Sequence, residues 1–122
     1  YRNTLMLSYA LSMAEVLKAN NILIGAVQDD ELGYPDCRKV YFDAFQKMAD
    51  LGGDGKNIKI ETPLLLLKKK DIVSKLLALK APVELSWSCY QANELACGVC
   101  DSCRLRLQAF KELGIKDPLK YQ

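Results

Sequence analysis

Four of the five cysteines lie close together near the carboxyl end of a chain that contains no histidine. They are Cys89, Cys97, Cys100 and Cys103, in the spacing C-x7-C-x2-C-x2-C. Two cysteines on a tight turn direct their sulfur atoms to one point, and Gly98 provides the backbone freedom that such a turn needs. Because Zn²⁺ prefers four thiolates in a tetrahedron at about 2.3 Å, the spacing predicts a closed, structural site for one zinc ion per chain.

The spacing of these cysteines also leaves alternatives to zinc open. An iron–sulfur cluster is one alternative, because the C-x2-C-x2-C run resembles ferredoxin spacing, although residues 104–109 lack the expected fourth cysteine. Four ordinary buried thiols are another. Disulfide pairing would leave one cysteine over, and nothing in the sequence indicates secretion.

Length and charge limit the classes of protein to which the chain can belong. Its 122 residues, half of them apolar, suffice for one modest core, which indicates one domain or part of one. A net charge of +2 is too balanced to indicate a nucleic-acid partner. Since no apolar run approaches the roughly 18 residues of a membrane helix and no signal peptide is recognisable, we expect no membrane association. Reduced, metal-bound cysteines indicate the cytoplasm.

Helical and strand patterns alternate along the sequence. We expect helices over 4–19, 38–51, 68–80 and 101–113, and strands over 22–27 and 58–61. The unbroken apolar run at 22–27 is typical of a strand buried on both faces of a parallel sheet. An acidic loop at 28–36 follows it, at the edge where open α/β sheets bind ligands. The order of elements predicts an α/β fold with a parallel sheet.

Polar residues at the predicted helix starts suggest caps. Asn3 or Thr4 can cap the first helix, Asp36 the second and Asp101 the last, which Gly114 would end. The apolar residues of the first helix cover so much of its circumference that we expect it to be packed on more than one side.

Several motifs together resemble one known family. The specific ones are Gly33-Tyr34-Pro35-Asp36-Cys37-Arg38 and Trp87-Ser88-Cys89-Tyr90 with the later Cys97-Gly98-x-Cys100-Asp101-Ser102-Cys103. Weaker matches are Arg2-Asn3, Thr62-Pro63-Leu64, Lys69-x-x-Ile72-Val73 and Asp117-Pro118 with Tyr121. In this order they cover nearly the whole chain, which resembles the 7-cyano-7-deazaguanine synthase family of queuosine biosynthesis, within the PP-loop ATP-pyrophosphatase superfamily.

The resemblance implies a fold and a division of the chain. The fold would be α/β, a Rossmann-like parallel sheet flanked by helices, incomplete here, with a carboxyl-terminal four-cysteine zinc-binding segment. Residues 1–86 would belong to the nucleotide-hydrolase-like domain, and residues 87–122 would form the zinc-binding segment and terminal helix. The family's nucleotide motif, Ser-Gly-Gly-x-Asp-Ser, has no match in the chain. We therefore expect a carboxyl-terminal part of a longer enzyme that binds ATP poorly and is inactive alone.

The resemblance also implies an activity. Such an enzyme is a cytoplasmic ligase, expected as a homodimer without direct nucleic-acid contact. It uses ATP, with Mg²⁺, to adenylate 7-carboxy-7-deazaguanine, lets ammonia displace AMP, and dehydrates the resulting amide to the nitrile. Two other functions stay open: a stand-alone zinc-stapled binding module, and a tRNA-modifying PP-loop enzyme with an iron–sulfur cluster.

Individual site residues follow from the matched motifs. The four clustered cysteines match the family's zinc ligands. The residues that match the substrate or nucleotide site are Arg2, Asn3, Asp30, Tyr34, Asp36, Arg38 and Lys69. Carboxylates can accept from a guanine-like N–H edge, and Arg and Lys can neutralise carboxylate or phosphate oxygens. We assign no catalytic residue: Cys37, the remaining thiol, has no activating base in sight, which favours a packing or positioning role.

Overall fold

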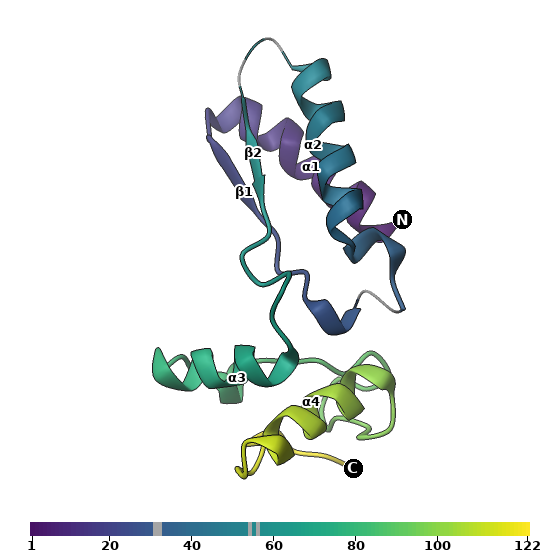
Figure 1. Ribbon diagram of the computed structural model, residues 1–122. Coiled ribbons are helices and arrows are strands. Elements are labelled where there is room, and N and C mark those ends of the chain that lie inside the picture. Colours follow the sequence, from purple (N-terminus) through teal and green to yellow (C-terminus); the bar gives the residue numbers. More distant parts are fainter. Residues whose placement is uncertain (31–32, 54, 56) are drawn as a thin grey trace. The chain divides into compact units, whose positions relative to one another are not determined.

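The computed structural model of the chain describes residues 1–30, 33–53, 55 and 57–122 (Figure 1). Glu31 and Leu32, which belong to the predicted acidic loop, lie outside the described residues, as do residues 54 and 56. The chain forms two compact units, Tyr1–Leu66 and Leu67–Gln122, and each is described by itself. The predicted domain division into 1–86 and 87–122 stays a prediction.

The first unit is built around two parallel strands. In chain order it contains α1 (Arg2–Leu17), β1 (Asn21–Leu23), α2 (Lys39–Gly52) and β2 (Lys59–Glu61), with 3-10 turns at Gln28–Asp30 and Pro35–Cys37. The middle pair of the register is Ile22 opposite Ile60. Because α2 lies in the connection between the strands, the unit contains a β–α–β crossover, as the alternating pattern predicts.

Both helices of the first unit pack against the same face of these strands. The main buried core of the first unit consists of Leu7, Ala26, Cys37, Phe42, Phe45 and Leu65, and Ile22 and Ile60 of the two strands pack against it. Alternate strand residues point to the opposite face, so Leu23 is 67% exposed. The structure therefore differs from the expected strand buried on both faces. Helix α1 carries apolar residues on more than one side. Among the described residues of the first unit, however, only the side with Leu7 is packed, so the expected packing on more than one side is not observed.

The second unit consists of two helices and a small core around the cysteines. Helix α3 (Lys69–Ala78) packs on α4 (Asp101–Glu112) through Val73, Ala109 and Phe110. The Asp71 carboxylate accepts the Lys68 N–H at 3.1 Å and so caps α3. Cys100, not Asp101, occupies the cap position of α4, and Asp101 is its first residue.

The two units confirm the α/β class with a parallel sheet flanked by helices and a cysteine-rich segment that follows it. Gly114 follows α4 with a φ of 67°, the left-handed conformation expected of a residue just after a helix. In the described part of the chain, no helix combines the length and the apolar character needed to cross a bilayer.

Candidate functional site

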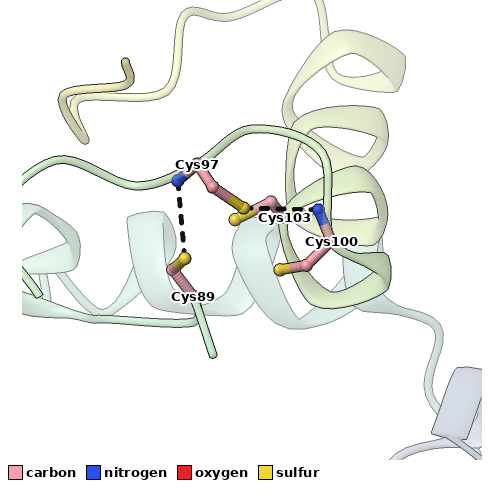
Figure 2. A group of neighbouring side chains, drawn as sticks. All are labelled: Cys89, Cys97, Cys100 and Cys103. Carbon is pink, nitrogen blue, oxygen red and sulfur yellow. Dashed lines mark hydrogen bonds between the residues drawn. The ribbon is translucent and has the colours of Figure 1, made fainter. Parts of the chain in front are cut away.

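The structure brings the four clustered cysteines together. Their Sγ atoms all lie within 4.8 Å of one another (Figure 2). Cys89 comes from the segment after the 3-10 turn Val83–Leu85, Cys97 and Cys100 from one turn, and Cys103 from the first turn of α4. Gly98 lies inside the turn with a φ of 69°, a conformation that favours glycine. The grouping predicted from the spacing is confirmed.

The geometry of the sulfur atoms suits a single tetrahedral ion. A tetrahedron with metal–sulfur bonds of about 2.3 Å has sulfur–sulfur distances of about 3.8 Å. The sulfur–sulfur distances observed here therefore need to shorten by at most about 1 Å when an ion binds. Backbone N–H groups already point at the sulfur atoms: the amides of Gln91 and Cys97 each donate to Cys89 Sγ at 3.4 Å, and the Cys100 amide donates to Cys97 Sγ at 3.4 Å. Such donors stabilise the negative charge of thiolates.

The sulfur atoms differ in how readily they ionise. The backbone N–H of Cys97 is the main cause that lowers the pKa of Cys89 to about 6, and the N–H of Tyr90 is the main cause that lowers the pKa of Cys100. Burial raises the pKa of Cys103 to about 12. A cation in their midst would compensate for the burial of the Cys103 thiolate, as would the amino end of α4. Four thiolates leave no open coordination position, so the arrangement suits a structural ion.

A second group of predicted site residues surrounds a hollow in the first unit. Arg2, Asn3, Tyr34 and Asp36 line it, together with Tyr1 and Cys37, and its volume is about 220 Å³. The Asn3 side-chain amide donates to Asp36 O at 2.9 Å and to Cys37 Sγ at 3.3 Å, which ties the start of α1 to the turn Pro35–Cys37.

The other three predicted residues occupy different places. Asp30 ends the 3-10 turn Gln28–Asp30, close enough to Cys37 for its charge to affect that thiol. Arg38 occupies the cap position of α2. Lys69 begins α3, in the second unit. The substrate-binding roles of all seven residues stay predictions.

Asp36 caps α1 and not α2. Its Oδ2 accepts the backbone N–H of Asn3, near the start of α1, at 3.0 Å. Among the described residues no side chain caps α2, which begins at Lys39. The expectation that Asp36 caps the second helix is therefore wrong, because its carboxylate meets a partner distant in sequence. The hydrogen bond from Asn3 is the main cause that lowers the pKa of Asp36.

Cys37 is a buried thiol and not an activated nucleophile. Burial is the main cause that raises its pKa, the charges of Asp30 and Asp36 raise it further, and the bond from Asn3 opposes them. A raised pKa keeps the sulfur protonated near neutral pH. This supports the packing or positioning role expected from the sequence.

Replacing Asp36 by alanine is expected to lower the free energy of unfolding by about 1 kcal/mol at pH 7, the usual cost of losing a cap. Because the folded pKa of Asp36 is lowered, this contribution is fully present above its ordinary value of 3.8 and is lost as the pH falls through the folded pKa. Urea unfolding at several pH values measures the difference. The control is Asp43→Ala, which removes only an exposed ion pair with Lys39 and should cost less than about 0.5 kcal/mol. Equal losses for both variants would contradict the capping role.

A buried ion pair beside the cysteine group was not predicted from the sequence. Arg106 and Asp117 are 5% and 7% exposed, and the guanidinium holds the carboxylate by two bonds, Nε to Oδ2 at 2.7 Å and Nη2 to Oδ1 at 2.8 Å. In the sequence, Asp117 and Tyr121 belong only to a motif of the resembled family. The position of Arg106, one helical turn after Cys103, was the one available signal.

Comparison with known proteins identifies a family and several relatives that the chain resembles. The sequence profile of the family described as "Queuosine biosynthesis protein QueC" matches residues 1–114. The chain is 53% identical, over 123 aligned residues, to the 7-cyano-7-deazaguanine synthase of Chlorobium phaeobacteroides, covering 100% of the chain and 54% of that relative. The 7-cyano-7-deazaguanine synthases of Chloroherpeton thalassium and a Sulfurovum species are 52% and 50% identical, covering 54% and 55% of their lengths. The chain spans about half the length of the curated relatives it matches.

Proposed function

Because this chain belongs to the QueC family of queuosine biosynthesis proteins, we propose that it forms part of a 7-cyano-7-deazaguanine synthase. The observation that carries the proposal is the 53% identity to a curated enzyme of that name along the whole chain. The four-cysteine group supports the proposal. The family resemblance implies that these cysteines bind one ion, and their Sγ atoms lie close enough together to do so. That the chain is the carboxyl-terminal part of the enzyme stays a prediction.

The proposed reaction converts a carboxylate into a nitrile by two adenylations. A carboxylate oxygen of 7-carboxy-7-deazaguanine attacks the α-phosphorus of ATP, and pyrophosphate leaves. Ammonia then attacks the acyl carbon, and AMP leaves with the oxygen, which gives the amide. The amide oxygen then attacks the α-phosphorus of a second ATP, and pyrophosphate leaves. AMP departs with that oxygen while both nitrogen-bound protons are lost, which leaves the carbon–nitrogen triple bond.

The hollow at the start of α1 offers the groups that such substrates need. The Arg2 guanidinium can hold carboxylate or phosphate oxygens by paired hydrogen bonds. The Asp36 carboxylate in the hollow can accept from the N–H edge of the deazaguanine, and Tyr34, 48% exposed, offers a ring face to it. The Asp30 carboxylate, which does not line the hollow, is proposed as a second acceptor because it matches the family's loop. Arg38, at the cap position of α2, and Lys69, at the start of α3 in the second unit, do not line the hollow and are proposed as substrate or nucleotide ligands only because they match the family's motifs. Asn3 holds Asp36 and Cys37 in place.

The ion in the cysteine group is proposed to be Zn²⁺, bound once per chain. An iron–sulfur cluster places several iron and sulfide atoms between its cysteines, so their sulfur atoms must stand further apart than around a single ion. Sulfur atoms within 4.8 Å of one another favour the single ion. Zinc bound there supplies no chemistry to the reaction and holds the loop-rich segment together. The proposed enzyme uses ATP together with Mg²⁺ and forms a homodimer. It is located in the cytoplasm and makes no direct contact with nucleic acid.

The test is an assay of the full-length protein that carries this chain. With 7-carboxy-7-deazaguanine, ammonia and Mg-ATP, liquid chromatography with mass spectrometry should detect the amide and then the nitrile, with one AMP released at each of the two stages. The chain Tyr1–Gln122 alone should form neither product. Failure of the full-length protein to form nitrile would contradict the proposed function, and nitrile formed by the chain alone would contradict the proposed dependence on the rest of the enzyme.

A further inference from the structure

The Arg106 guanidinium is linked, directly or through the carboxyl-terminal tail, to every segment that supplies a sulfur atom to the cysteine group. Arg106 lies on α4, one turn after Cys103. Its Nη1 donates to Ser86 Oγ at 2.7 Å and to Ser86 O at 3.2 Å, in the segment that leads to Cys89. Its Nε and Nη2 hold Asp117, in the carboxyl-terminal tail. The side chain thus links α4, the segment before Cys89 and the tail.

The tail in turn holds the segment that carries Cys97. Ala96, fully buried and directly before Cys97, donates its N–H to Lys120 O at 2.9 Å and accepts the Gln122 N–H at 2.9 Å. This forms a parallel bridge between Ala96 and Tyr121. The Tyr121 ring also lies 3.6 Å from the place that a side-chain carbon at Gly98 would occupy, so it packs directly on the turn between Cys97 and Cys100.

Tyr121 and Asp117 lock the tail in this position. The Tyr121 hydroxyl donates to Asp117 Oδ2 at 2.6 Å, and the Leu119 N–H donates to Asp117 Oδ1 at 3.0 Å. Burial and the bond to Asp117 raise the pKa of Tyr121, so the hydroxyl keeps its proton and remains a donor near neutral pH. Each carboxylate oxygen of Asp117 therefore has two donors, one from Arg106 and one from the tail itself.

We infer that Arg106, Asp117 and Tyr121 form a positioning network for the metal centre, which fixes the Cys89 segment, the Cys97 turn and the α4 end relative to one another and thereby slows release of the ion. The inference rests on the proposed zinc site. None of the three residues coordinates the ion; they hold the backbone that presents the sulfur atoms. Groups that hydrogen-bond directly to metal ligands typically change metal affinity by about 10-fold to 100-fold when replaced. Because these three residues act one step further from the ion, we expect an effect at the lower end of that range.

The experiment measures zinc transfer from the loaded full-length protein to an excess of a coloured chelator. Tyr121→Phe removes one hydroxyl and keeps the ring that packs on Gly98, and Arg106→Lys keeps the charge but loses the paired bonds. Each is expected to speed zinc release by about tenfold and to alter the absorption bands of the Co²⁺-substituted protein, which report the ligand geometry. The matched control for Tyr121→Phe is Tyr9→Phe, at a tyrosine that is 79% exposed in the first unit.

A second control separates positioning from simple loss of stability. Val73→Ala truncates a buried residue of the α3–α4 core and lowers stability while all hydrogen-bonding groups of Arg106, Asp117 and Tyr121 are kept. If Val73→Ala speeds zinc release as much as Tyr121→Phe at an equal drop in melting temperature, the positioning role is overturned. Unchanged release and unchanged Co²⁺ spectra in both network variants would overturn it too. Absence of bound metal from the wild-type protein would overturn the zinc site itself, a result distinguishable from the other two.

Discussion

Replacement of Cys103 by serine is expected to weaken zinc binding by about a hundredfold and to loosen the second unit. Cys103 is fully buried and supplies one of the four sulfur atoms of the group. Structural zinc sites with four ligands bind with about 10–16 kcal/mol, so one thiolate accounts for about 3 kcal/mol, or about a hundredfold in affinity. Native mass spectrometry of the purified full-length protein gives the zinc content, and competition with a chelator gives the affinity.

The structural effect should be confined to the segments that supply the four cysteines of the proposed zinc site. Between the turn Val83–Leu85 and α4 the chain has no helix among its described residues and a local core of only Cys89, Ala96 and Cys103. Amide hydrogen exchange should therefore rise most in residues 87–103. The matched control is Cys37→Ser, at a buried cysteine of the first unit, which should keep its zinc. Loss of zinc from both variants, or from neither, would contradict the assignment of the site.

Local spacing explains why the cysteine group could be predicted. Cys97, Cys100 and Cys103 lie within seven consecutive residues, so turn and helix geometry alone brings their sulfur atoms close together. The helices were predicted for a similar reason: the expected ranges 38–51 and 101–113 end within one residue of α2 and α4, because apolar periodicity, Gly52 and Gly114 are local signals. The two-strand parallel sheet followed from the order of these elements.

Contacts between distant residues explain the rest. Asp36 meets Asn3 across 33 positions, so its role as the cap of α1 has no local signal. Arg106 contacts Ser86 and Asp117, which lie 20 and 11 positions away in the sequence. The helical pattern of the sequence does not distinguish a buried arginine from an exposed one. Leu23 belongs to an apolar run that indicated burial, yet the two helices of the first unit cover only the other face of β1.

Replacing Arg106 by alanine is expected to lower the free energy of unfolding by about 3 to 5 kcal/mol, the usual cost of leaving a buried charge without its partner. The side chains of Arg106 and Asp117 are only 6% and 3% exposed, so solvent screens their interaction little. The variant also loses the stacking of the guanidinium on the Phe110 ring, at 5.4 Å. Urea unfolding of the full-length protein at fixed free zinc measures the change, because bound metal itself stabilises the folded state.

The double variant Arg106→Met with Asp117→Leu tests the cause of that loss. It removes both charges at similar volume, so it should be more stable than Arg106→Ala, in which Asp117 stays buried and charged. Burial alone would raise the pKa of Asp117, but the bonds from Arg106 and Tyr121 outweigh burial and lower it. The contribution of the pair is therefore present above pH about 4 and is lost only in more acidic solution, so pH 7 is the condition for the comparison. If the double variant is as unstable as Arg106→Ala at that pH, the unpaired carboxylate is not the main cause of the loss.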